Sequence, residues 1–266
     1  MPAAEAIAAL VDVHGPRLYS LASRLCRHEG DAQDMVQDVF LQAYRKWHTF
    51  QGNADPGTWL YAIAARSCKA RMRRKGGINR RMPAMSQLMP FRDSRMIEPA
   101  GNGDGPLGQT IEREAAEAVR QAITRLPEHF RVPLVLKEML ELPIEEVADA
   151  LAIKPETVKT RVHRARLLLR SEIMHRARVP KTPAPPANYE RRVCLDLLKA
   201  KMDAMDRGRT FPVGQEVVCD RCRGVFAELD LAHNACARLA EGRMPAAVRR
   251  AILGAVREAD RNTARK

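Results

Sequence analysis

The residues with the clearest chemical potential lie between 157 and 166, where hydroxyl, imidazole and cationic side chains recur every three or four positions. On a helix this spacing places them on one face. Hydroxyl, imidazole and guanidinium groups can hydrogen-bond base edges in a DNA major groove, and Lys or Arg can pair with phosphates. The sequence therefore predicts base contacts from Thr157, Thr160, His163 and Arg164, and phosphate contacts from Lys159, Arg161 and Arg166.

Two helices joined by a short turn are expected to position this face. The first helix has an apolar stripe at spacing i, i+3, i+4, i+7, formed by Ile144, Val147, Ala148 and Leu151. The turn covers 152–154, and the second helix begins with Pro155 and is apolar behind its polar face. This pattern is typical of a helix-turn-helix, whereas the plainer interpretation is a hairpin with a solvated basic face. Ala152 stands at the turn position where Gly is usual, because Gly adopts a positive φ readily. A residue with a Cβ at that φ costs about 1 kcal/mol.

A second basic segment follows a loop rich in turn-forming residues at 49–58. The helix after this loop begins with Trp59 and ends in a run of cationic residues that includes Arg66, Arg71, Arg73 and Arg74. Rings on which bases stack and cations that meet phosphates are what an opened single strand of DNA requires. The alternative is that Trp59 is a core residue.

Four of the six cysteines come late in the chain, at Cys194, Cys219, Cys222 and Cys236. Cys219 and Cys222 form a C-x-x-C, a spacing that suits two ligands of one zinc ion. Either His233 with Cys236, or Cys194, can complete such a site. A continuous helix over 223–240 would place His233 about 16 Å from Cys222, which favours Cys194, Cys219 and Cys222 as the ligands. A vestigial site and a redox dithiol are the other interpretations.

The composition favours a polyanionic partner, because 45 Lys and Arg face 32 Asp and Glu for a net charge of +13. Nucleic acid is the first candidate and an anionic membrane surface the second. No apolar run approaches the roughly 20 residues that span a bilayer, and the N-terminus does not resemble a secretory signal. We therefore expect a cytoplasmic protein with reduced Cys26 and Cys68. Scarce β-branched alternation predicts an all-α fold.

Two segments resemble regions of bacterial extracytoplasmic-function (ECF) sigma factors, the promoter-specificity subunits of RNA polymerase. The segment DAQDMVQDVFLQAYRKWHTFQGNADPGTWLYAIAARSCKARMRR resembles their region 2, with its D-A-x-D-x-x-Q-x-x-F helix and its W-L-Y-x-I-A. The segment LPEHFRVPLVLKEMLELPIEEVADALAIKPETVKTRVHRARLLLR resembles their region 4, including T-V-K-x-R-x-x-R-A-R. Both stand in the family's order, and together they cover most of residues 5–175.

The resemblance implies roles for particular residues. The acidic ridge of Asp34, Gln37 and Asp38, which composition alone assigns to a solvated face, would bind core RNA polymerase. The −10 promoter element would meet Phe50, Asn53, Trp59, Arg66, Arg71, Arg73 and Arg74. The helix-turn-helix would read the −35 element of promoter DNA. Many members have Arg-Asn after W-L-Y-x-I-A and an Asp four residues later, but Ala65-Arg66 and Ala70 stand there in this chain. The resemblance therefore does not extend to base selection at −10.

The predicted organisation is a sigma region 2-like domain at 1–75, a flexible linker at 76–110, a region 4-like domain at 111–178, a Pro-rich linker at 179–189 and a helical Cys-containing module at 190–266. This last part, called the C-terminal module below, resembles a zinc-binding anti-sigma domain, with Gln215 at the position of the family's His. We expect the C-terminal module to contact the sigma domains of the same chain and restrain them. An amphipathic helix after Pro245 is expected to dock on the sigma part.

Three functions follow, in decreasing order of support. The first is a sigma factor that requires no cofactor, with zinc at the late cysteines as an addition. The second is a free-standing helix-turn-helix regulator with a metal- or redox-sensing tail, which leaves the region 2 likeness unexplained. The third is a thiol oxidoreductase centred on Cys219 and Cys222, which lacks the expected βαβ context. No Gly-rich phosphate loop, nucleophile elbow or carboxylate pair indicates another enzyme.

Overall fold

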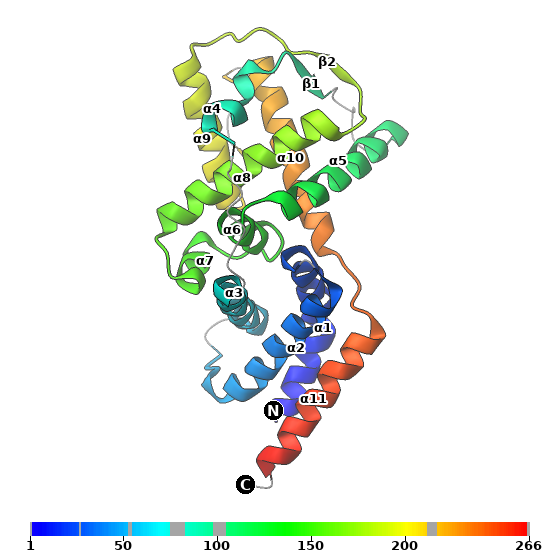
Figure 1. Ribbon diagram of the computed structural model, residues 1–266. Coiled ribbons are helices and arrows are strands. Elements are labelled where there is room, and N and C mark those ends of the chain that lie inside the picture. The colour runs from blue at the N-terminus through cyan, green and yellow to red at the C-terminus, as the bar shows by residue number, and fades with distance from the viewer. Residues whose placement is uncertain are drawn as a thin grey trace. The chain divides into compact units, whose positions relative to one another are not determined.

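Helices make up nearly all of the regular structure in the described residues, which confirms the predicted all-α class (Figure 1). The computed structural model describes residues 2–26, 28–52, 55–74, 83–97, 105–211 and 217–264. The chain divides into two compact units. Unit 1 comprises Met1–Asn79, Arg131–Val158 and Leu239–Lys266, and unit 2 comprises Arg80–Phe130 and Lys159–Arg238. None of the described helices is long and apolar enough to cross a membrane.

Unit 1 combines the N-terminal helices with two later ones. Its elements are α1 (Ala3–Leu25), α2 (Glu29–Lys46), the 3-10 turn η1 (Trp47–Thr49), α3 (Pro56–Arg74), α7 (Ile144–Leu151) and α11 (Ala246–Ala264). The first three α-helices pack on one another, α7 packs on α3, and α11 packs on α1 and α2 (Figure 1). Fully buried Leu18, Phe40 and Leu60 bring α1, α2 and α3 into one core. The helix predicted after Pro245 thus packs on the N-terminal helices, as expected.

Two local expectations from the sequence are wrong in unit 1: Gly15-Pro16 indicates a break or a new helix start, and Asp31 is a plausible N-cap for the next helix. Gly15 and Pro16 do not interrupt α1, which continues to Leu25 with Pro16 inside it. The lost hydrogen bond of an internal proline is offset by burial of α1 residues on both sides of it, Leu10 and Leu18 among them. Asp31 is not the N-cap of α2, because the helix begins at Glu29 and Asp31 lies in its first turn. There its carboxylate still interacts favourably with the positive end of the helix dipole.

Unit 2 contains the second helix of the predicted helix-turn-helix together with the early part of the C-terminal module. Its elements are α4 (Met85–Leu88), the 3-10 turn η2 (Pro90–Arg92), β1 (Arg95–Ile97), α5 (Pro106–Arg125), most of α8 (Pro155–Arg176), β2 (Lys181–Pro183), α9 (Arg191–Asp206) and most of α10 (Asp220–Ala240). The remaining helix, α6 (Glu128–Glu138), spans the boundary of the units. The continuous α10 confirms the helix predicted over 223–240.

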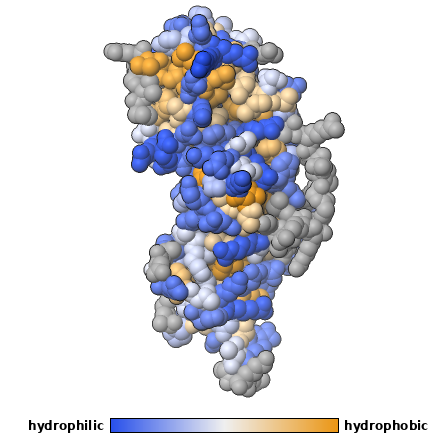
Figure 2. All heavy atoms as spheres, turned by 90° about the vertical axis from the view of Figure 1, so that its left-hand side faces the viewer, coloured by the Kyte–Doolittle hydropathy of each residue, from blue (hydrophilic) through white to orange (hydrophobic). Residues whose placement is uncertain are grey.

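One hydrophobic core in unit 2 joins segments that are distant in sequence. Leu88 and Met96 come from residues 83–97, Leu167 from α8, Leu198 from α9 and Leu229 from α10. The short strands β1 and β2 pair antiparallel, with Arg95 opposite Pro183 and Ile97 opposite Lys181. The sequence did not predict regular structure at 83–97, which we call the linker segment. Figure 2 shows further hydrophobic residues gathered on the surface of this unit, where Met85, Tyr189 and Val193 are exposed.

The turn between α7 and α8 keeps its usual geometry without a glycine. Ala152 has φ 46° and ψ 57°, in the left-handed region. The N–H of Ile153 donates to the carbonyl of Ala148 at 3.1 Å, which closes the end of α7. The carbonyl of Lys154 then accepts from the N–H groups of Thr157 and Val158 and starts α8.

Replacing Ala152 by Gly is expected to raise the free energy of unfolding by about 0.5–1 kcal/mol, because Gly has no Cβ to oppose a positive φ. Urea denaturation followed by circular dichroism measures the change. Ala150→Gly, inside α7, is the matched control and should lower the free energy by about 1 kcal/mol. Destabilisation by Ala152→Gly would contradict the account of the turn.

Candidate nucleic-acid interface

The face of α8 that is predicted to read DNA begins at the surface. Thr160 is exposed, and Thr157, Lys159 and Arg161 are partly exposed. These residues occupy the first turns of α8, whose N-terminal residues would enter a groove in a helix-turn-helix. The geometry of this half of the face is therefore compatible with DNA contact as it stands.

The next turn of the same face is covered by α9. His163 donates from Nε2 to Asp206 Oδ2 at 2.8 Å, and Arg166 Nη1 donates to Asp206 Oδ1 at 2.6 Å. The side chains of Arg166 and Asp206 are only 4% and 3% exposed. Burial alone would raise the pKa of Asp206, but the hydrogen bond from His163 and the charge of Arg166 outweigh it and lower that pKa. A carboxylate thus sits where a phosphate or base edge was predicted.

Arg164 is also held by groups of its own unit. Its Nη2 donates to the carbonyl of Pro83 at 3.3 Å, and its guanidinium lies 5.2 Å from the ring centroid of Phe130. Cation–π contacts of this kind contribute about 0.5–2 kcal/mol. His163, Arg164 and Arg166, all predicted to contact DNA, therefore have intramolecular partners in this conformation.

A buried ion-pair network lies one turn beyond them on α8. Arg170 is 2% exposed and pairs with Asp93 at 2.8 Å and with Glu228 at 2.5 Å. The N–H of Ile97 donates to Glu228 Oε1 at 3.1 Å. Burial raises the pKa of Glu228, and Arg170 counters part of that shift. This network ties α8 and α10 to the linker segment.

Arg221 of α10 holds the linker segment from another side. Its Nη2 donates to the carbonyls of Phe91 and Asp93 at 2.9 and 2.8 Å, and its Nη1 donates to the carbonyl of Pro185 at 2.9 Å. Three carbonyls in two segments thus share one guanidinium. Arg221 thus binds the linker segment to the C-terminal module, and the pairing of β1 with β2 joins the linker segment to the Pro-rich linker.

The sequence prediction missed the acidic partners in unit 2. These are Asp93, Asp206 and Glu228. One signal was present: Glu228 lies in the apolar stripe of α10 between Val225 and Leu229, which are buried. A charged residue in such a stripe needs a buried partner. No local pattern identifies that partner as Arg170.

The predicted polymerase-binding ridge lies at the surface of unit 1. Asp34 and Asp38 are exposed on α2, and Gln37 is partly exposed. On another part of α2, the hydroxyl of Tyr44 donates to Asp260 of α11 at 2.9 Å. The second polar anchor of α11 joins Arg249 to Asp12 of α1 at 2.7 Å. The docked α11 therefore leaves the acidic ridge accessible.

The residues predicted for the −10 element are partly described. Phe50 stacks on Trp47 with ring centroids 5.1 Å apart and lies 5.4 Å from Trp59. These rings form one cluster in which Phe50 and Trp59 stay partly accessible, and Arg66 is exposed further along α3. Asn53 lies outside the described residues, and of Arg71, Arg73 and Arg74 the structure describes only the helical backbone.

Elements of the predicted region 4 pack on elements of the predicted region 2 within unit 1. α7 contacts α3. Arg17 of α1 donates to the carbonyl of Met139 at 2.7 Å and pairs with Glu141 at 2.8 Å. Unit 1 is thus a closed arrangement, in which the first helix of the helix-turn-helix lies against the helix predicted to hold the −10 element.

The three cysteines predicted as metal ligands are buried in the core of unit 2. Cys194, Cys219 and Cys222 are 2%, 6% and 0% exposed. Burial and the neighbouring Cys219 and Cys194 thiols raise the pKa of Cys222. Burial also acts to raise the pKa of Cys219, but hydrogen bonds, first from the backbone of Asn188, lower it. His233 lies three turns beyond Cys222 on α10.

Comparisons with known proteins identify both regions. The family model of Sigma-70 region 2 matches residues 10–78, and that of Sigma-70 region 4 matches residues 116–169. The ECF RNA polymerase sigma factor SigW of Bacillus subtilis is 30% identical over 172 residues, covering 64% of this chain and 89% of SigW. SigE of Mycolicibacterium smegmatis is 32% identical over 167 residues, which are 60% of this chain and 59% of SigE.

A solved structure matches a comparable share of the chain. In the co-crystal structure of the sigma factor RpoE with the anti-sigma factor NepR from Bartonella quintana, the matching chain is 24% identical. The match covers 62% of this chain and 94% of that chain, with a TM-score of 0.43. The later of the two family-model matches ends at residue 169, whereas Asp206, Arg221 and Glu228 come after it in the chain.

Proposed function

The chain belongs to the ECF family of RNA polymerase sigma factors, and we propose that its own C-terminal module holds it in a closed, restrained form. As a sigma factor it directs core RNA polymerase to promoter DNA for transcription initiation. We assign the −35 contacts to the α8 residues 157–166, the −10 contacts to α3 with the preceding loop, and polymerase binding to Asp34, Gln37 and Asp38.

The observation that carries the proposed restraint is the position of Asp206. Its carboxylate engages His163 and Arg166, two of the residues that would face DNA. A phosphate and a carboxylate compete for the same guanidinium donors. The −35 element therefore cannot take these side chains until α9 moves away from α8.

The linker segment gives a second reason for restraint. Its hydrogen bonds to Arg221 and Glu228 and its buried Leu88 and Met96 fasten it to the C-terminal module. A linker that joins regions 2 and 4 sets how far they can separate. Holding residues 83–97 shortens that reach.

The promoter itself supplies the third reason. Elements at −10 and −35 are about 25 base pairs apart, or about 85 Å along the DNA. In unit 1, α7 of region 4 contacts α3 of region 2. Regions that touch cannot occupy both promoter elements at once, so productive binding requires the closed arrangement to open.

We also propose zinc at the three late cysteines. Three sulfur donors suit the chemistry of Zn²⁺, and Cys194, Cys219 and Cys222 share one buried core. Their sulfur atoms do not all lie within 4.8 Å of one another among the described residues, so zinc binding would have to draw them closer. The fourth ligand position suggested by the anti-sigma resemblance falls on Gln215, outside the described residues. A bound ion would hold the thiols as thiolates and would join α9 to the start of α10.

The sigma assignment is tested by run-off transcription with core polymerase on a promoter library, with the full chain and with the chain ending at residue 179. Transcripts that start at defined sites only when the protein is present are the expected result. A free-standing regulator, which does not account for the region 2 match, would bind DNA without polymerase and start no transcript. Absence of transcripts with both forms would refute the assignment.

Replacing Arg221 by Ala tests whether the linker segment is held. Losing a charged donor to three carbonyls should destabilise this contact by about 2 kcal/mol, which is roughly a 30-fold gain in local opening. Hydrogen–deuterium exchange of residues 90–97 measures it. Arg223→Ala, which removes an exposed pair within α10, is the control. Equal protection in the two variants would show that Arg221 does not hold the linker segment.

A further inference from the structure

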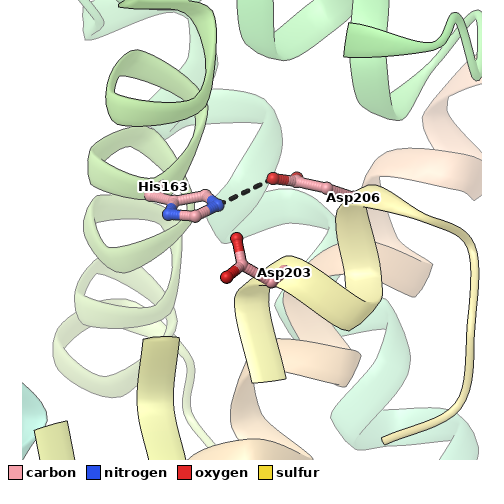
Figure 3. A group of neighbouring side chains, drawn as sticks. All are labelled: His163, Asp203 and Asp206. Atoms are coloured by element: carbon pink, nitrogen blue, oxygen red, sulfur yellow. Dashed lines mark hydrogen bonds and ion pairs between the residues drawn. The ribbon is translucent and has the colours of Figure 1, made fainter. Parts of the chain in front are cut away.

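A cluster of ligand-type side chains joins α8 to the end of α9. Figure 3 shows Asp203 and Asp206 projecting from α9 toward His163 of α8. One ligand atom from each of the three residues lies within 4.8 Å of the other two. Asp206 is buried, and His163 and Asp203 are half-buried. The cluster is separate from the three cysteines and has an imidazole nitrogen and carboxylate oxygens as donors.

The charge of this cluster favours a cation. The cluster holds two carboxylates, Asp203 and Asp206, and the guanidinium of Arg166 pairs with Asp206 at 2.6 Å. Arg166 balances one of the two carboxylate charges, and no second Lys or Arg is paired with the cluster in the described contacts. A partly buried excess charge is costly unless a counter-charge neutralises it. A divalent cation that replaces the Nε2 proton of His163, with the ring proton held on Nδ1, and that binds the two carboxylates supplies that counter-charge.

We propose that His163, Asp203 and Asp206 form a binding site for a divalent transition-metal ion. One imidazole and two carboxylates are a donor set that suits Zn²⁺ or Co²⁺. Neighbouring donors of a tetrahedral Zn²⁺ are about 3.3 Å apart, between the 2.8 Å of the His163–Asp206 hydrogen bond and the 4.8 Å limit of the group. Arg166 holds the other oxygen of Asp206 and so orients that ligand.

The consequence for regulation rests on the proposed function. His163 comes from the helix that would read DNA, whereas both carboxylates come from the C-terminal module. A metal ion bound by all three fastens the module to α8, and DNA that takes His163 breaks the site. Metal and DNA then weaken each other's binding by the same factor. A bound ion therefore stabilises the restrained form.

Titration of the full chain with Co²⁺ tests the site, because cobalt bound by nitrogen and oxygen lacks the thiolate charge-transfer bands that the cysteines would produce. We expect one sulfur-free binding event that Asp203→Asn weakens at least about tenfold, as loss of a ligand should cost no less than loss of an outer-shell partner. Asp196→Asn, at an exposed position of α9, is the control. The hydrogen bonds of Asp206 to His163 and Arg166 do not involve Asp203, so Asp203→Asn leaves them in place.

Two outcomes overturn the site: no sulfur-free event in the wild-type chain, or Asp203→Asn binding Co²⁺ as tightly as Asp196→Asn. The DNA arm repeats the titration with a −35 duplex, and Co²⁺ should weaken DNA binding by the wild-type chain and not by Asp203→Asn. Cobalt binding that depends on Asp203 but leaves DNA affinity unchanged would uphold the site and contradict the proposed restraint. The two proposals can therefore fail separately.

Discussion

Asp206→Ala is expected to bind a −35 promoter duplex about tenfold or more tightly than the wild-type chain. Removing one partner of a buried ion pair destabilises the state that contains it by about 3–5 kcal/mol. Here that state is the restrained one, because His163 and Arg166 regain water or DNA when α9 leaves. The variant keeps every side chain predicted to contact DNA. In the wild-type chain only the small open fraction binds DNA, which lowers the apparent affinity. The variant is open more of the time, so its apparent affinity for DNA rises.

Fluorescence anisotropy at one fixed salt concentration measures this effect, since phosphate contacts make the affinity depend on salt. Asp196→Ala is the matched control, because it removes an exposed carboxylate from the same helix and changes the net charge equally. Equal affinities for Asp206→Ala and Asp196→Ala would show that Asp206 does not block the interface.

Deleting residues 180–266 is expected to raise promoter-specific transcription about tenfold or more. The deletion removes the Asp206 contact, the partners of the linker segment and the α11 helix that packs on α1 and α2. It also uncovers Leu167 and Arg170 on α8, which are buried in the full chain. Circular dichroism should therefore confirm that the shortened chain is folded before run-off transcription is compared.

A chain ending at residue 243 separates the contributions. It lacks α11 but keeps Asp206, Arg221 and Glu228, so we expect a smaller increase than for the chain ending at 179. Unchanged or lower transcription from the 179-residue form, with its helical content retained, would mean that the C-terminal module does not restrain the factor.

The elements that could be predicted from sequence are those with strong local signals. The apolar spacing from Ile144 to Leu151 and the start at Pro155 define α7 and α8, and the absence of Pro over 223–240 defines α10. The strained position of Ala152 was also predictable, because it follows from where a turn must lie. Pro16 and Asp31 misled because packing of α1 and α2 outweighed local preferences.

The partners of the candidate interface were not predictable in the same way. His163 and Asp206 are 43 residues apart, and Arg170 and Asp93 are further apart still. Helical periodicity shows which face of α8 is polar, but it does not show which distant carboxylate meets that face. The structure of the linker segment was not predicted for a similar reason, since a three-residue strand and two buried side chains leave almost no periodic signal.

The most direct test of the central claim is the distance between region 2 and region 4 in solution. Spin labels attached by non-cysteine chemistry at exposed Lys46 of α2 and exposed Asp149 of α7 report on unit 1 by pulsed electron paramagnetic resonance. The account predicts one short, narrow distance in the full chain and a longer, broad distribution in the chain ending at residue 179. The same narrow distance in both chains would contradict restraint by the C-terminal module.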